Sequence, residues 1–95
     1  MMTEEQQKHK AALRDAEDTI RHLTKRALAK LRMPDVVGMR QLRRIDPVLD
    51  ATCKRSYARD KVGMRLAFIA ANTILEAGYE RNMRFEHDFV YRRKQ

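Results

Sequence analysis

The chain has 95 residues, of which 43% are hydrophobic and 36% are charged, and it contains three glycines and two prolines. A chain of this length forms one domain, and so few glycines and prolines exclude a turn-rich β fold and long loops. The formal charge is +8, from 21 Lys and Arg against 13 Asp and Glu. A positive field of this size favours polyanionic partners, with nucleic acid first and an acidic protein surface second.

Cysteine use and hydropathy bear on the compartment. Cys53 is the only cysteine, so no intramolecular disulfide can form, and a lone thiol fits a reducing cytosol. Residues 1–10 are polar where a signal peptide needs an apolar run. The longest apolar stretch, residues 66–75, is about half a membrane span. We therefore expect a cytoplasmic protein without a membrane segment.

The first predicted element is a long helix that begins after Thr3. Thr3 and Gln6 have the spacing of a capping box, and no glycine or proline follows until Pro34. Apolar residues then recur at alternating steps of three and four, which is a short heptad seam. They are Leu13, Ala16, Ile20, Leu23 and Ala27. The pattern predicts a long helix that packs along a partner helix, in its own chain or in a second copy.

Proline and aspartate divide the next segment. Pro34 ends the first helix, and Asp35 can cap a short helix over 36–45. Asp46 followed by Pro47 predicts a new helix that starts at Pro47. Asp60 offers a further cap, so 47–78 forms either one helix or two. A break at 60 is slightly favoured, because the apolar face shifts there.

Residues 61–78 form the most apolar stretch of the chain. Val62, Leu66 and Ile69 begin a regular apolar face, while Met64 and Phe68 belong to a second set that covers much of the remaining circumference. A helix that is apolar nearly all round is a buried one. We therefore expect a buried central helix at about 61–78, wrapped by the other helices or completed by a second chain.

The C-terminal residues allow two interpretations. Apolar and aromatic residues alternate with charged ones from Met83 to Tyr91, which is a strand period, yet Phe85 and Phe89 are also one helical turn apart. A lone strand in a helical chain would need a second copy to pair with, so we favour a short helix or an ordered tail. The overall prediction is an all-α domain over 1–95: a bundle of three to five helices, homodimeric, frayed at 1–8 and 92–95.

No pattern in the chain indicates catalysis. Phosphate loops, nucleophile motifs and zinc spacings are absent from the sequence, and Cys53 falls on the apolar side of its predicted helix. The acidic residues are scattered, without a pair in an apolar pocket. We predict a non-enzymatic protein without cofactor or metal.

The candidate binding site is a run of basic residues between positions 40 and 65. Two short helices joined at Asp46 and Pro47 could present them to a duplex as a helix-turn-helix does, mainly through the phosphate backbone. The alternative is a helical protein–protein interaction module, an inhibitor or adaptor that binds an acidic surface of a larger partner. The predicted binding residues are Arg40, Arg43, Arg44, Lys54, Arg55, Arg59, Lys61 and Arg65.

Overall fold

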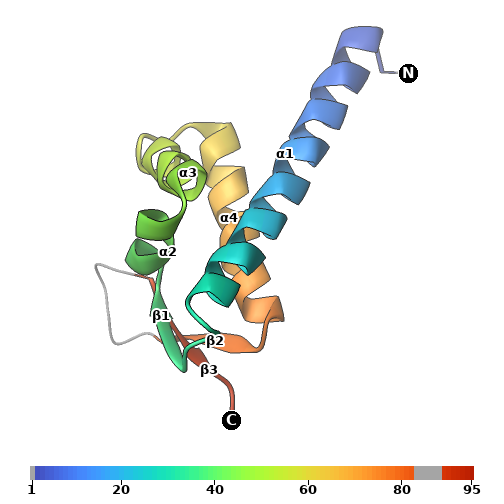
Figure 1. The fold of residues 1–95 in the computed structure, drawn as a ribbon. Coiled ribbons are helices and arrows are strands. Elements are labelled where there is room, and N and C mark those ends of the chain that lie inside the picture. The colour runs from blue at the N-terminus through green and yellow to red at the C-terminus, as the bar shows by residue number, and fades with distance from the viewer. Residues whose placement is uncertain (1, 83–88) are drawn as a thin grey trace.

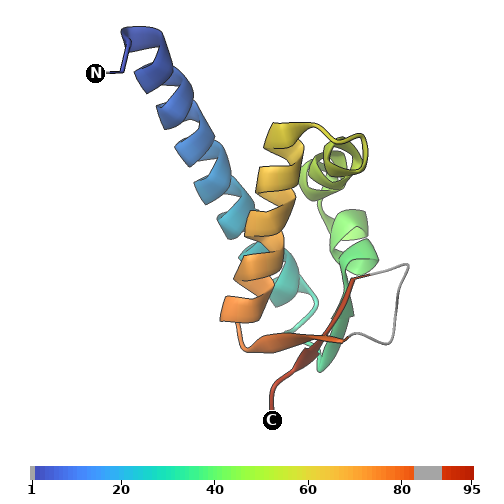
Figure 2. The same ribbon diagram turned by 180° about the vertical axis from the view of Figure 1, so that it is seen from behind.

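The computed structural model describes residues 2–82 and 89–95, and in this part the chain forms four helices and three short strands (Figure 1). In chain order they are α1 (Glu4–Lys30), β1 (Val36–Gly38), α2 (Met39–Ile45), α3 (Pro47–Tyr57), α4 (Lys61–Glu76), β2 (Tyr79–Asn82) and β3 (Val90–Arg93). Figure 2 shows the same elements from behind, with the sheet below the helices.

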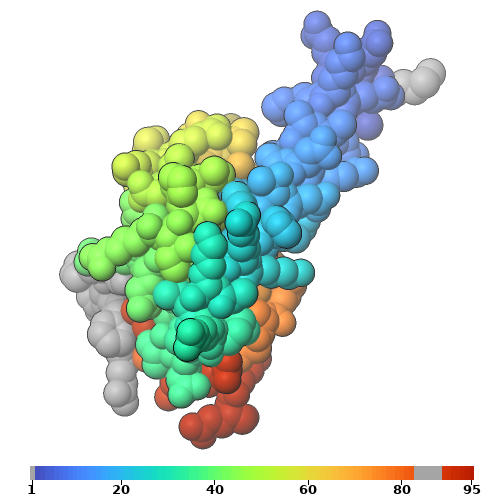
Figure 3. Space-filling view, in the orientation of Figure 1, coloured from blue at the N-terminus to red at the C-terminus, as the bar shows by residue number. Residues whose placement is uncertain are grey.

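The long first helix and its capping box are confirmed. The Thr3 hydroxyl accepts from the Gln6 amide at 3.2 Å, and the Gln6 side chain accepts from the Thr3 amide at 2.9 Å. At 1.5 Å per residue α1 is about 40 Å long. Its N-terminal half projects from the body (Figure 3), and its first buried residue is Ile20. Only the second half of α1 therefore contributes to the core.

The core forms where the inner face of α4 meets α1 and α3. Leu66, Ile69 and Ile74 are buried on this face, and they pack with residues such as Leu28 of α1 and Leu49 of α3. The favoured break between two helices is also confirmed. α3 ends at Tyr57, and Asp60 caps α4 by accepting from the Gly63 amide at 3.0 Å.

The predicted all-α class is confirmed only in part: the described chain is mostly helical, but it also contains a three-stranded antiparallel sheet in the order β1-β3-β2. Residues 36–38 form β1 instead of the first turn of a helix, and 79–82 and 90–93 are strands instead of a short helix or tail. Val37 lies opposite Tyr91 in the sheet. The strand partner comes from the same chain, so the sheet needs no second copy. Met83, Phe85 and His87 lie outside the described residues.

The sheet is joined to the helices through its buried tyrosines. Tyr79 and Tyr91 are among the most buried residues, and the Tyr79 hydroxyl donates to the Pro34 carbonyl. Gly78, which has φ of +100°, ends α4 in the left-handed conformation that glycine adopts without strain. The chain thus turns from α4 directly into β2.

The prediction that the central helix is buried nearly all round is wrong for one face. Met64 is 50% exposed, Phe68 is 61% exposed and Leu75 is 39% exposed. They lie on the side of α4 opposite its buried residues, because α1 and α3 both pack against the inner face. The outer face is therefore left apolar and open to solvent.

Gly63 gives a test of the α3–α4 packing. A Cβ at position 63 would overlap the Cβ of Arg55 and come within 2.9 Å of the Ser56 backbone nitrogen. Replacing a helical glycine by alanine normally stabilises a helix by about 1 kcal/mol. Here we expect Gly63→Ala to destabilise the protein by about 1–3 kcal/mol, since the helices would have to separate.

Urea denaturation followed by circular dichroism measures this change. Asn72→Ala is the matched control, because Asn72 is exposed on the same helix and alanine improves its helix propensity. The control should be neutral or slightly stabilising. A stabilising Gly63→Ala would contradict the close approach of the two helices.

Candidate functional site

The eight predicted basic residues fall into two groups on the α2–α3–α4 side of the molecule. One group lies on α2 and the facing side of α3, and we call it the α2 cluster. The other surrounds the turn between α3 and α4, and we call it the turn cluster. The α2 cluster is Arg40, Arg43, Arg44 and Lys54, and the turn cluster is Arg55, Arg59, Lys61 and Arg65.

In the α2 cluster, one carboxylate holds two of the four cations. Asp50 accepts from the Arg43 Nε at 2.8 Å and lies 3.0 Å from the Lys54 Nζ. Hydrogen bonds from Lys54, and then from Arg43, keep the pKa of the Asp50 carboxyl below its ordinary value. The Arg43 guanidinium also lies 5.5 Å from the centre of the Tyr57 ring. A shallow depression beside Asp50 is lined by Arg40, Arg43 and Arg44.

In the turn cluster, two acidic residues hold two cations. Asp60 accepts from the Arg55 Nε at 3.1 Å and from its Nη2 at 2.9 Å, while it also caps α4. Glu17 of α1 accepts from the Arg65 Nε at 2.8 Å. Arg59 stands in the turn with φ of 62°, in the left-handed region. The two pairs tie α3 to the turn and α4 to α1.

Four of the predicted cations have no acidic partner within residues 2–82 and 89–95. They are Arg40 and Arg44 in the α2 cluster and Arg59 and Lys61 in the turn cluster, and all four are exposed. The two pairs stand near opposite ends of α3, which is about 16 Å long at 1.5 Å per residue. Exposed cations without an internal partner are available for external phosphates.

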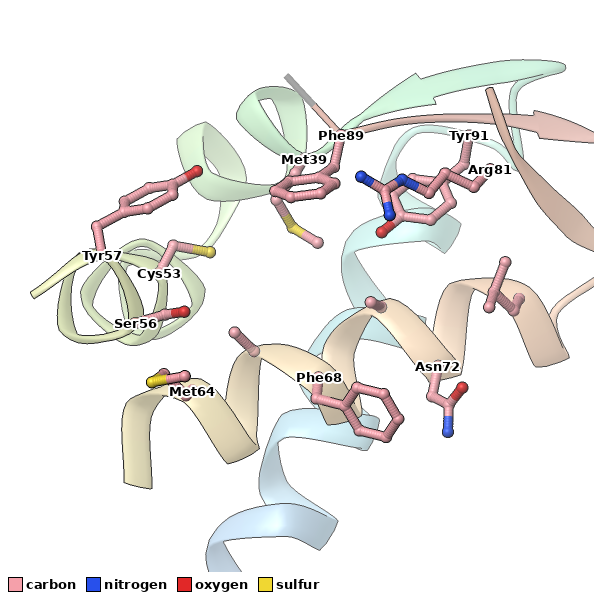
Figure 4. A pocket seen from close by; sticks show the side chains of 13 residues that line it. Met39, Cys53, Ser56, Tyr57, Met64, Phe68, Asn72, Arg81, Phe89 and Tyr91 are labelled. Atoms are coloured by element: carbon pink, nitrogen blue, oxygen red, sulfur yellow. The ribbon is translucent and has the colours of Figure 1, made fainter. Parts of the chain in front are cut away.

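A second surface, which the sequence pattern did not predict, is an apolar groove between α3, α4 and the β2–β3 hairpin (Figure 4). Its cavity volume is about 390 Å³. Among the described residues, eight large hydrophobic side chains are exposed, and five of them line this groove. The five are Tyr57, Met64, Phe68, Leu75 and Phe89.

The groove has a floor of small residues and walls of large ones. Ala67 and Ala71 of α4 form part of the lining, and Tyr57 of α3 and Phe89 both lie on the same side of α4 (Figure 4). The Arg81 guanidinium lies 4.5 Å from the centre of the Phe89 ring. The sequence does contain a signal for this groove, the second set of apolar residues on 61–78. From this set we predicted a helix that is buried nearly all round.

Two further features of the described residues concern reactive chemistry, namely the thiol of Cys53 and possible groups of metal-binding side chains. Cys53 is buried beside the groove, as expected for a structural thiol, and burial raises the pKa of its thiol. In the part of the chain that the structure describes, no three His, Cys, Asp or Glu side chains gather as metal ligands. The same part holds no helix with the length and apolar character needed to cross a bilayer.

No protein-family model matches the chain, and comparisons with curated proteins and with solved structures give no significant match. The two surfaces therefore carry the functional argument by themselves.

Asp60 gives a pH-dependent test of the turn cluster. The Gly63 amide first, and the Arg55 guanidinium second, lower the pKa of the Asp60 carboxyl in the folded protein. A carboxyl whose pKa is lowered on folding stabilises the protein above its unfolded pKa, and this stability is lost as the pH falls through the folded pKa. We expect Asp60→Ala to lower the urea midpoint at pH 7, with a difference from wild type that shrinks below about pH 4.

The measurement is a series of urea denaturation curves from pH 7 to pH 2.5, with Asp15→Ala as the control. Asp15 is an exposed carboxylate on α1 outside both clusters, so its removal should leave the midpoint nearly unchanged at every pH. A constant difference between Asp60→Ala and wild type across the pH range would contradict the assigned role of the Asp60 charge.

Proposed function

We propose that this is a non-enzymatic nucleic-acid-binding protein that contacts mainly the phosphate backbone. The observation that carries the proposal is a group of four exposed cations, Arg40, Arg44, Arg59 and Lys61, that have no acidic partner within the described residues and lie near the two ends of α3, in a chain with net charge +8. Neutralising phosphates with such side chains releases counterions, which drives binding without base contacts.

The helix-turn-helix that supports this proposal is α3, the turn 58–60 and α4. A turn of three residues joins α3 to α4, whereas only Asp46 separates α2 from α3, where the sequence analysis placed the motif. In Figure 1, α3 is seen nearly end-on where α4 is seen from the side, so the two helices cross steeply. The left-handed turn residue is Arg59, which explains why no glycine marks the motif in the sequence.

The sheet adds a second feature that nucleic-acid-binding domains use. Two-stranded β ribbons enter DNA grooves in some nucleic-acid-binding proteins, and β2 and β3 form an antiparallel pair here. Fold alone does not fix function, so this likeness only supports the charge argument.

The first turn of α4 favours phosphate contacts over base reading. In a helix-turn-helix, residues near the start of the second helix contact base edges. Here that region presents Lys61 and Arg65 next to Met64, and the face beyond is apolar. Lysine and arginine bind phosphate, while residues 61–65 include no Asn or Gln, the side chains that read adenine.

The protein-interaction module remains the second candidate function, and the apolar groove is the specific observation that favours it. Both functions are compatible with a cytoplasmic location, which the single buried Cys53 supports. The homodimer stays a prediction, which light scattering at high protein concentration tests. An 11.2 kDa mass under those conditions would contradict it.

The nucleic-acid proposal is tested by titrating labelled duplex DNA and RNA at several salt concentrations. With four phosphates neutralised, the slope of log K against log salt should be about −4. Replacing the four unpaired cations by glutamine should flatten this slope toward zero and abolish measurable binding at about 0.15 M salt.

The matched control changes the same number of charges on the projecting helix, at Lys8, Lys10, Arg14 and Lys25. This variant should keep most of the slope, because these residues lie on α1 and outside both clusters. If the two variants lost the same amount of affinity for nucleic acid, net charge alone would account for binding. Absence of binding by the wild type at low salt would refute the proposed function.

A further inference from the structure

We infer that the apolar groove is a docking site for an acidic amphipathic helix of another protein. This goes beyond nucleic-acid binding and is independent of it, since it rests on the outer face of α4 and the β2–β3 hairpin. Its evidence is the distribution of exposed apolar side chains, the shape of the groove and the charges beside its walls.

The exposed apolar residues of α4 form one straight stripe. At 100° per residue, Met64, Phe68, Ala71 and Leu75 project within about 60° of one another, opposite the buried face of the helix. Solvent-exposed apolar side chains that gather in one place mark interaction surfaces, whereas scattered ones need no explanation. The three exposed large hydrophobic residues outside the groove are Met2, Val36 and Val48, and they belong to three different elements or termini.

The dimensions of the stripe suit a helix as the occupant. From Met64 to Leu75 it runs about 16 Å, which equals three turns of a second helix lying alongside. Ala67 and Ala71 leave room for large side chains from that helix, and Tyr57 and Phe89 line one side of it. A helix docked in a groove presents its anchors at positions i, i+3 or i+4, and i+7.

The charges beside the aromatic walls select an acidic helix. Arg81 lines the groove, stacks on Phe89 and has no acidic partner within the described residues. Carboxylates on the side of the docked helix that faces Phe89 would therefore meet the Arg81 guanidinium at the groove wall. Such complementarity raises the association rate and excludes partners of the opposite charge pattern.

A second copy of this chain fits the groove less well. Two copies would each bring Arg81 of the groove wall and a net charge of +8 to the interface, so like charges would meet. The projecting part of α1, residues 4–19, has only one large apolar side chain, Leu13, and cannot supply three anchors. The occupant is therefore a separate acidic partner.

The test uses a fluorescein-labelled synthetic peptide of about 16 residues, with leucines at i, i+4, i+7 and i+11 and glutamates on both flanks. A peptide of the same composition with the leucine spacing scrambled is the ligand control. Binding to the full chain is followed by fluorescence anisotropy. The patterned peptide should bind, and the scrambled one should bind at least about tenfold more weakly.

The variants are chosen at exposed positions, so that they leave the core intact. Phe68→Ser, and independently Met64→Ser, should weaken peptide binding by about tenfold or more, and Arg81→Glu should weaken it by several-fold. Val48→Ser removes an equally exposed hydrophobic side chain outside the groove and should change binding less than about twofold. Phe68→Ser should bind nucleic acid like the wild type, so the two proposals can fail separately.

Three peptide-binding results would overturn the inference. They are no binding of the patterned peptide, equal binding of the scrambled peptide, and patterned-peptide binding that survives both serine substitutions in the groove. A dimer mass in light scattering that Phe68→Ser abolishes would also overturn it, because a second copy would then occupy the groove.

Discussion

The packing of α4 between α1 and α3 is the constraint on which the rest of the structure depends. Its inner face buries Leu66, Ile69 and Ile74, and each such side chain contributes about 1.5–3 kcal/mol when fully buried. Gly63 lets α3 come close enough for its backbone to touch α4. Because both partner helices press on one side of α4, the opposite side is left for the groove, and the start of α4 is fixed next to the basic turn.

Charge pairing determines which cations are available for a ligand. Asp50, Asp60 and Glu17 each hold one or two basic side chains, and these ion pairs join elements that the core alone would leave adjustable. Exposed ion pairs of this kind contribute little to the free energy of unfolding. Their main effects are to orient the helices and to neutralise the basic side chains that they bind. Among the predicted binding residues, the positive charge without an acidic partner in the described part of the chain is therefore smaller than the composition suggests, and it lies near the two ends of α3.

The sequence predicted the helices well and the sheet poorly, for a physical reason. Caps are local signals: Thr3, Asp46 and Asp60 each act on amides within three residues, so their helix starts follow from short stretches of sequence. The strands depend on pairing between Val37 and Tyr91, which are far apart in the chain. Three-residue and four-residue strands have too little periodicity to reveal such a pairing.

The same division applies to function. By itself the sequence determined the excess of positive charge, the basic run between positions 40 and 65 and the lone thiol, because these are properties of composition and order. Only the tertiary structure decided which of those cations are paired, and it turned the second apolar face of residues 61–78 into an open groove. Whether an apolar side chain is buried depends on what packs against it, and for Phe68 the elements that could cover it lie on the other side of α4.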